Sequence, residues 1–291
     1  MKTMDKPLNR RVAVITGASS GIGKETAKTL VSQGWFVIGL GRNPERCQQA
    51  EQDIAAPAGG GSLLMLCGDL AELTEARRIA AYIAQYTDRV DALLNNAGGV
   101  NRERRLTQEG NEYTFAGNHL GHFLLLRELL PLLRKAAASS EPGATRVVNV
   151  SSSAHHICEG VDWDDLQMKD NFVSMVAYSR AKLANLLFTR ELAKRLQADG
   201  IVVHAMHPGI VGSNFANHGD EALRDYFSTK GDEIVLPEVA AETLIWLASA
   251  AEPSSSTGQY FYQKQVAPTS TTAQDDSAAA RLWQISEELT A

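Results

Sequence analysis

Cysteine is scarce in this sequence, and its spacing excludes the common cysteine-based sites. The 291 residues include Cys47, Cys67 and Cys158, and no Cys-x-x-Cys pair or Cys/His cluster. An odd number of widely spaced cysteines is typical of free thiols in a reducing compartment. We therefore expect a cytoplasmic protein without a metal site.

Long apolar runs are also absent. The most apolar long stretch, residues 123–133, is interrupted by Arg127 and Glu128, and the first eleven residues are polar. A membrane-spanning helix needs about 20 apolar residues, and a secretory signal needs an apolar core near the N-terminus. The sequence therefore predicts neither.

Positive charge is not in excess. The formal net charge is −6, and the 44% hydrophobic and 21% charged residues make an ordinary globular composition. The arginine cluster at residues 102–105 is short and contains Glu103, so a solvated loop is its simplest interpretation. No basic stripe or tail indicates a nucleic-acid partner.

The chain alternates short apolar runs with helical patterns. Runs that are apolar throughout are typical of parallel strands covered on both faces. No repeat, linker or composition shift marks a second domain. The prediction is one α/β domain over residues 1–291, with strands near 11–15, 35–40, 63–67, 91–94, 146–150, 201–206 and 258–262.

A glycine-rich turn, Thr16-Gly17-Ala18-Ser19-Ser20-Gly21-Ile22-Gly23, follows the first predicted strand and precedes a helical pattern. Glycines let the backbone approach a pyrophosphate, and a helix N-terminus supplies N–H groups and a positive dipole end. The spacing differs from the usual G-x-G-x-x-G, but its position favours a dinucleotide site.

The second and third predicted strands end in residues suited to an adenosine. In dinucleotide-binding folds the end of the second strand meets the ribose, and an acid there favours NAD. Here Arg42 occupies that place. Arginine suits the 2′-phosphate of NADP, although it is also common at exposed strand ends. Asp69 follows the third strand, where it meets the adenine, caps a helix beginning near Leu73, or does both.

Two asparagine-containing stretches come next. The run Asn95-Asn96-Ala97-Gly98-Gly99 follows the fourth strand, and its small residues leave room beside a flat cofactor, although an ordinary turn has the same composition. Asn118 lies inside a helix predicted over residues 107–138. Asparagine is a mediocre helix former, so it either has a special role or bonds a neighbouring carbonyl.

The serine run Ser151-Ser152-Ser153 follows the fifth strand. A serine there could contact a substrate carbonyl oxygen. No G-x-S-x-G sequence surrounds it, so a nucleophilic serine of a hydrolase is disfavoured. The neighbouring His155 and His156 are interpreted as loop residues.

Tyr178 and Lys182 are four residues apart at the start of a long helical pattern. Residues at this spacing share one helix face. A free tyrosine has a pKa near ~10, and a nearby cation lowers it toward the range of a general acid/base. Alone, this spacing is usually a solvated helix face, so its weight depends on the other motifs.

The last third of the chain contains a predicted turn, a predicted lid and a C-terminal helix. His207 to Ser213 follow the sixth strand as a rigid turn. Residues 214–232 are polar and irregular, which favours a lid, with a disordered excursion as the alternative. Helical patterns cover 237–250 and 278–289.

Taken together, these motifs resemble the short-chain dehydrogenase/reductase family. The pattern comprises the glycine turn, Asn95 to Gly98, Asn118, Ser152 and Tyr178-x-x-x-Lys182, and it spans nearly the whole chain. The stretches at 118–123, 149–155, 182–185, 207–211 and 282–286 are similar to the retinol dehydrogenase group and its bacterial relatives.

The resemblance implies a Rossmann-like, doubly wound parallel sheet of about seven strands with helices on both faces, and hydride transfer with NAD(P). It makes Tyr178 the proton donor in carbonyl reduction, and Lys182 the group that lowers its pKa and holds the nicotinamide ribose. Ser152 aligns the substrate oxygen, and Asn118 holds a water in a proton relay. The implied cofactor-binding residues are Gly17, Ser19, Ser20, Gly21, Ile22, Gly23, Arg42, Asp69, Leu70, Asn96, Ala97, Gly98, Tyr178, Lys182, Pro208, Gly209, Val211 and Ser213.

The sequence therefore predicts an NADP-preferring oxidoreductase, with NAD as the alternative, that interconverts an alcohol and a ketone or aldehyde. Two other interpretations remain: a cofactor-sensing regulator or scaffold without turnover, and a carbon–carbon double-bond reductase. The polar lid sequence disfavours a retinoid or steroid substrate. The resemblance also implies a homodimer or homotetramer packed through helices near Thr107 and Ala177, with Leu183, Leu186 and Leu187 either in that interface or in the core.

Overall fold

The computed structural model describes residues 10–54, 60–212 and 221–291. Its centre is an eight-stranded sheet in the order β10-β9-β6-β5-β4-β1-β2-β3. These strands are β1 (Val12–Thr16), β2 (Phe36–Gly41), β3 (Ser62–Cys67), β4 (Ala92–Asn95), β5 (Arg146–Val150), β6 (Val202–Met206), β9 (Tyr260–Tyr262) and β10 (Gln265–Val266). All are parallel except β10, which pairs antiparallel with β9. The doubly wound α/β prediction is confirmed, with β10 as one strand more than expected.

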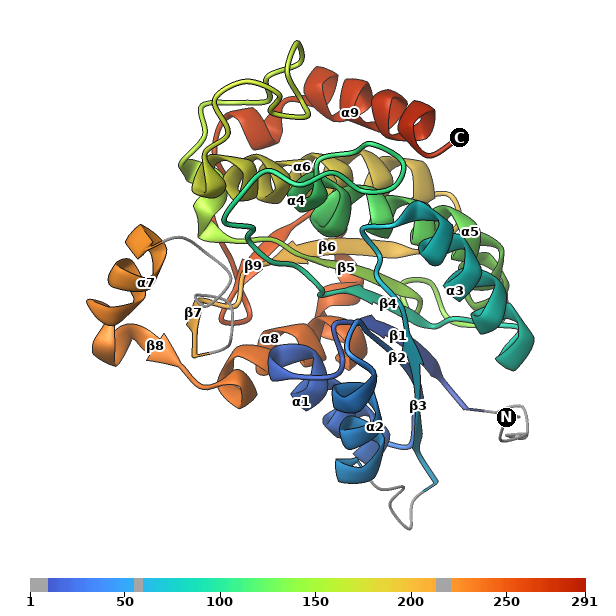
Figure 1. The fold of residues 1–291 in the computed structure, drawn as a ribbon. Coiled ribbons are helices and arrows are strands. Elements are labelled where there is room, and N and C mark those ends of the chain that lie inside the picture. Colours follow the sequence, from blue (N-terminus) through green and yellow to red (C-terminus); the bar gives the residue numbers. More distant parts are fainter. Residues whose placement is uncertain (1–9, 55–59, 213–220) are drawn as a thin grey trace.

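Helices cover both faces of the sheet (Figure 1). On one face lie α3 (Leu73–Tyr86), α5 (Gly121–Ala138) and α6 (Ser174–Leu196), with α9 (Asp276–Leu289) packed on α6. The other face carries α1 (Gly21–Ser32), α2 (Pro44–Asp53) and α8 (Pro237–Ser249). This arrangement leaves the carboxyl ends of the parallel strands along one edge, where open α/β sheets bind ligands.

The strands contribute side chains to two hydrophobic cores, one on each face of the sheet, because neighbouring side chains along a strand point to opposite faces. In β1, Val12 and Val14 join the core under α3, α5 and α6, whereas Ala13 and Ile15 join the core under α1 and α8. All five residues of β1 are buried. An apolar run of this kind is therefore explained by coverage on both sides.

The helix predicted over residues 107–138 was placed too early. The structure has α4 (Tyr113–Phe115), a π-helical turn (Ala116–Leu120) that contains Asn118, and then α5. The preceding residues form a tight loop in which the Thr107 amide donates to the Asn111 carbonyl at 2.8 Å. Glu112 begins the helix by accepting hydrogen bonds from the amides of Thr114 and Phe115, a side-chain cap that the apolar pattern alone did not show.

The segment predicted to be irregular near 214–232 contains a helix, α7 (Glu221–Ser228), and a short turn, Gly231–Glu233. Residues 213–220 lie outside the described ranges. On either side of this segment, β7 (Ile210–Val211) and β8 (Ile234–Val235) pair as a separate two-stranded sheet. The two short strands bring the ends of the segment together beside the carboxyl edge of the main sheet.

The three leucines considered for an oligomer interface lie inside the chain. Leu183, Leu186 and Leu187 are 0%, 4% and 0% exposed and belong to the core between sheet, α5 and α6. The outward side of α6 is covered in part by α9, where Asp276 pairs with Lys194 at 2.7 Å. These leucines are therefore core residues, and the interface interpretation of them is wrong.

Candidate active site

The glycine turn after β1 has a backbone that needs its glycines. Gly17 and Gly21 have φ angles of +72° and +54°, which side chains disfavour. A Cβ on Gly23 would lie 2.4 Å from the Gly17 carbonyl oxygen. The helix α1 begins at Gly21, has no side-chain N-cap hydrogen bond and no acid in its first turn. Its free amides and positive dipole end suit a pyrophosphate, so this turn fits the predicted dinucleotide.

A chain of hydrogen bonds joins this turn to the loop after β4 and to the helix that carries Asn118. The Ala97 amide donates to the Thr16 hydroxyl at 2.7 Å, and that hydroxyl lies 2.9 Å from His122 Nε2. His122 Nδ1 lies 3.0 Å from the Asn118 carbonyl oxygen, which can only accept, so Nδ1 carries the proton. Burial lowers the pKa of His122 to about 4, so the ring is neutral.

The three serines after β5 have different environments. Ser151 is buried and its hydroxyl donates to the Lys182 carbonyl at 2.8 Å. Ser152 is half-buried, and its hydroxyl hydrogen-bonds the Tyr178 hydroxyl. Ser153 is exposed. Only Ser152 is therefore both bonded to the tyrosine and open to a ligand.

Lys182 and Asn118 meet at Gly98. The Lys182 ammonium lies 5.4 Å from the centre of the Tyr178 ring and donates to the Val150 carbonyl at 3.0 Å. A Cβ on Gly98 would be 2.8 Å from Lys182 Nζ and 2.6 Å from Asn118 Oδ1. The structure thus brings all four predicted catalytic residues to one place, between the ends of β4 and β5 and the start of α6.

Burial dominates the electrostatics of this place. It raises the pKa of Tyr178 to about 12, and the hydrogen bond from Ser152 offsets only part of that rise. It also lowers the pKa of Lys182 to about 7. The expectation that the tyrosine pKa is lowered is therefore wrong, because burial disfavours the charged phenolate and raises the pKa of Tyr178.

The Asn118 side chain holds the loop after β4. Its amide nitrogen donates to the carbonyls of Gly99, at 2.9 Å, and Thr114, at 2.7 Å, and its oxygen accepts from the Gly99 amide at 3.1 Å. Asn118 is 2% exposed. A mid-helix asparagine is accommodated here because, from the π-helical turn, its side chain hydrogen-bonds backbone groups of Gly99 and Thr114.

At the adenosine end, Arg42 and Asp69 are linked through Tyr113. Arg42 Nη1 donates to the Tyr113 hydroxyl at 3.3 Å, and that hydroxyl donates to Asp69. The other Asp69 oxygen accepts from the Ala71 amide at 3.0 Å. The residue at the N-cap of α3 is Glu72, so the helix-capping interpretation of Asp69 is wrong.

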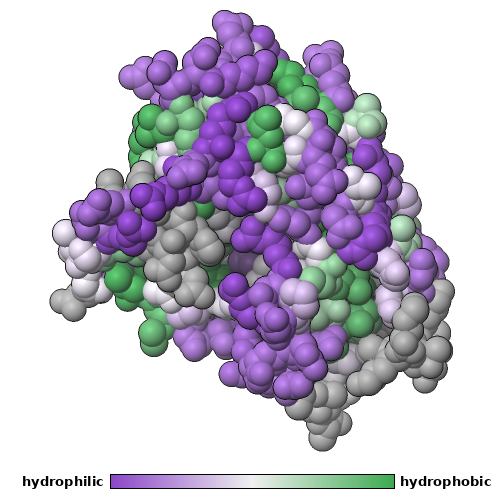
Figure 2. Space-filling view, viewed as in Figure 1, coloured by the Kyte–Doolittle hydropathy of each residue, from purple (hydrophilic) through white to green (hydrophobic). Residues whose placement is uncertain are grey.

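The remaining predicted cofactor residues follow β1, β3, β4 and β6 along the same edge. Ile22 and Leu70 direct their side chains into the two cores, and Asn96 donates to the Thr16 carbonyl at 2.8 Å. Ser213 lies outside the described residues. The others on this edge are Ser19, Ser20, Ala97, Pro208, Gly209 and Val211. Figure 2 shows a hollow bordered by hydrophilic residues near the middle of the molecular surface in this view.

Comparison with known proteins decides the family. Residues 11–223 match the short chain dehydrogenase family. The chain is a short-chain dehydrogenase. It is 37% identical over 288 residues to retinol dehydrogenase 13 of Homo sapiens, covering 96% of this chain and 84% of that protein. It is 36% identical to retinol dehydrogenase 14 of Mus musculus, covering 96% and 86%.

Solved structures agree with this assignment. An uncharacterised protein from Mycobacterium paratuberculosis has a TM-score of 0.73 at 31% identity, covering 99% of this dehydrogenase and 96% of that chain. RhlG of Pseudomonas aeruginosa, solved with NADP, has a TM-score of 0.68 at 28% identity, covering 87% and 94%. A nicotinamide-dependent oxidoreductase acting on CH–OH groups is therefore established at the level of the family.

Sequence reasoning missed two parts of this dehydrogenase site. His122 was given no role beyond its place in the 118–123 stretch that resembles the retinol dehydrogenase group, and Tyr113 was not singled out. The position of His122 on an apolar helix pattern was a usable signal for a buried hydrogen bond, since a polar residue on a buried helix face needs a partner. Nothing in the sequence marked Tyr113, whose contact with Arg42 spans 71 residues.

No helix among the described residues is long and apolar enough to cross a bilayer.

Proposed function

We propose that this dehydrogenase is an NADP-preferring enzyme that interconverts an alcohol and an aldehyde or ketone, with Tyr178 as its general acid/base. The observation that carries the proposal is the convergence of Ser152, Tyr178 and Lys182 beside Gly98, on the same edge as the glycine turn. NADPH, when bound, supplies the hydride to the carbonyl carbon.

The protein's own residues orient the carbonyl and supply the proton. The hydroxyls of Ser152 and Tyr178 are bonded to each other, so a carbonyl oxygen accepting from both would be held and polarised there. Tyr178 then donates its proton to that oxygen. Lys182, whose ammonium donates to the Val150 carbonyl at 3.0 Å, would supply the donor that holds the nicotinamide ribose.

The two directions of the reaction should respond differently to pH. Tyr178 has a pKa near 12 because it is buried, so it holds its proton at neutral pH, the form needed for reduction. Alcohol oxidation needs the phenolate, whose fraction grows as pH rises toward that pKa. We expect kcat/KM for oxidation to climb between about pH 7 and about pH 10, while that for reduction does not climb. Oxidation that slows over this range would contradict the assignment.

The cofactor preference rests on Arg42. Its guanidinium follows the end of β2, is exposed, and donates a hydrogen bond to the Tyr113 hydroxyl rather than to a carboxylate among the described residues. Arg42→Ala should weaken the binding of NADPH by about tenfold or more, because a charge-assisted hydrogen bond to the 2′-phosphate is lost. The binding of NADH should change little. Fluorescence titration of both cofactors measures this. Arg46→Ala, which removes an exposed cation one turn into α2, is the control, and equal losses of both cofactors in Arg42→Ala would refute the preference.

The inner side of α7 supports an apolar substrate. We propose that α7 is part of the predicted lid, since Leu223 is 4% exposed and packs with Val100 and Tyr178, with Phe227 beside them. The charged residues Arg224 and Asp225 are exposed. The polar sequence of the lid therefore describes its outside, and relatives named retinol dehydrogenases favour apolar aldehydes or their alcohols as substrates.

A substrate screen tests the reaction class. Wild-type protein with NADPH is offered apolar aldehydes, ketones and α,β-unsaturated ketones, and products are identified by chromatography. Alcohols are the expected products, including allylic alcohols from the unsaturated ketones. Saturated ketones would indicate reduction of carbon–carbon double bonds, and cofactor binding without any product would favour a sensor.

A further inference from the structure

Tyr113 stands between two arginines at the adenosine end of the site. Arg42 donates to its hydroxyl at 3.3 Å, and the Arg105 guanidinium lies over its ring, 4.6 Å from the ring centre. The Tyr113 side chain is 8% exposed, so it is a fixed part of the fold. One ring thus brings together cations from two loops that are far apart in sequence.

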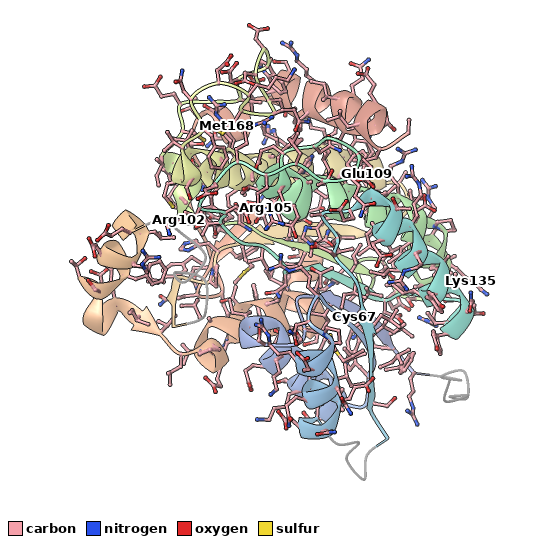
Figure 3. The ribbon with its side chains drawn as sticks, viewed as in Figure 1. Cys67, Arg102, Arg105, Glu109, Lys135 and Met168 are labelled. Atoms are coloured by element: carbon pink, nitrogen blue, oxygen red, sulfur yellow. The ribbon has the colours of Figure 1, made fainter. Side chains whose placement is uncertain are left out.

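The backbone fixes Arg105 in this position. The Tyr113 amide donates to the Arg105 carbonyl at 2.9 Å, and the next residue, Leu106, forms a β-bridge with Glu112. Glu112, 2% exposed, in turn caps the helix that begins at Tyr113. Figure 3 shows Arg102 nearer α7 and Arg105 nearer the middle of the molecule. Arg105 is exposed, as the solvated-loop interpretation of the cluster predicts, and its guanidinium is also held over the Tyr113 ring.

Both guanidinium groups keep their charge available. Neither Arg42 nor Arg105 forms an ion pair with any carboxylate in the described ranges, and both are exposed. Asp69, the carboxylate at this place, bonds the Tyr113 hydroxyl and the Ala71 amide instead. Two unpaired cations beside one aromatic ring favour a ligand with more than one negative charge.

We propose that Arg105 is a second arginine for the 2′-phosphate of NADPH, with Tyr113 as the platform that positions it. A phosphate monoester carries about −1.5 to −2 charge at neutral pH and offers three acceptor oxygens, enough for two guanidinium groups. Arg42 approaches from the end of β2 and Arg105 from the loop after β4. This inference rests on the proposed preference for NADP and adds a residue that discriminates between the two cofactors.

The test compares four proteins in the same titration: wild type, Arg42→Ala, Arg105→Ala and Arg102→Ala. Arg102 is the matched control, since it is exposed and lies on the same loop. Arg105→Ala should weaken the binding of NADPH by about 5- to 20-fold and should change the binding of NADH little. This range lies between the energy of an exposed ion pair and that of a charge-assisted hydrogen bond. Arg102→Ala should bind both cofactors as the wild type does. Far-ultraviolet circular dichroism checks that each variant is folded.

The outcomes separate this inference from the proposed function. A selective loss in Arg42→Ala with no loss in Arg105→Ala would overturn the role of Arg105 and leave the NADP preference intact. Equal loss of NADPH and NADH in Arg105→Ala would place the arginine on the shared adenine and overturn the phosphate assignment. Tighter binding of NADH than NADPH by the wild type would overturn the preference itself, and the inference with it.

Discussion

Tyr178→Phe is expected to lower kcat by about 10²–10⁴-fold, the usual contribution of a general acid/base, while NADPH binding is unchanged. The substitution removes only the hydroxyl, which bonds Ser152. The ring, 8% exposed and packed with Val100 and Leu223, stays in place. Its contact with the Lys182 ammonium, 5.4 Å from the ring centre, is also preserved. Steady-state turnover and cofactor titration on the same preparation separate the two effects.

A second variant guards against a purely structural explanation. Ser152→Ala removes the other hydroxyl of the pair and leaves the phenol in place, so it should also lower kcat without changing cofactor affinity. A structural defect would instead lower the thermal unfolding midpoint and NADPH affinity together. If Tyr178→Phe turned over within tenfold of the wild type, Tyr178 could not be the proton donor.

The sequence predicted the strands of the doubly wound parallel sheet because apolar runs and the helical patterns between them are local patterns. Apolar runs such as β1 reveal coverage on both faces. Glycines at Gly17 and Gly23 are required by local backbone geometry and close contacts. Tyr178 and Lys182 are one helical turn apart, so their proximity follows from helix geometry. Such features are visible within a few residues of chain.

The remainder depends on contacts between distant segments. Tyr113 reaches Arg42 and Asp69 across 71 and 44 residues, and no short pattern encodes these pairs. The direction of the pKa shift of Tyr178 was also not predicted, because the spacing to Lys182 is visible in the sequence but the burial of both groups is not. Burial then decides the sign of the pKa shift.

Gly98→Ala should damage the catalytic part of the site severely. The added Cβ would lie 2.6 Å from Asn118 Oδ1 and 2.8 Å from Lys182 Nζ. Neither group can move freely, since Asn118 bonds the Gly99 and Thr114 carbonyls and Lys182 bonds the Val150 carbonyl. A displacement of about 1 Å at such groups costs on the order of 10²-fold in rate. We expect a loss of that size in kcat/KM, together with weaker NADPH binding.

Gly99→Ala is the matched control, because it changes the neighbouring residue by the same single methyl group. A Cβ at Gly99 meets no atom within 4 Å, and neither glycine has a positive φ angle. Alanine also keeps the backbone amide and carbonyl that Gly99 shares with Asn118. Gly99→Ala should therefore keep nearly full activity. Similar losses in both variants would mean that the loop as a whole tolerates no methyl group, and that Lys182 and Asn118 do not depend on the space at Gly98.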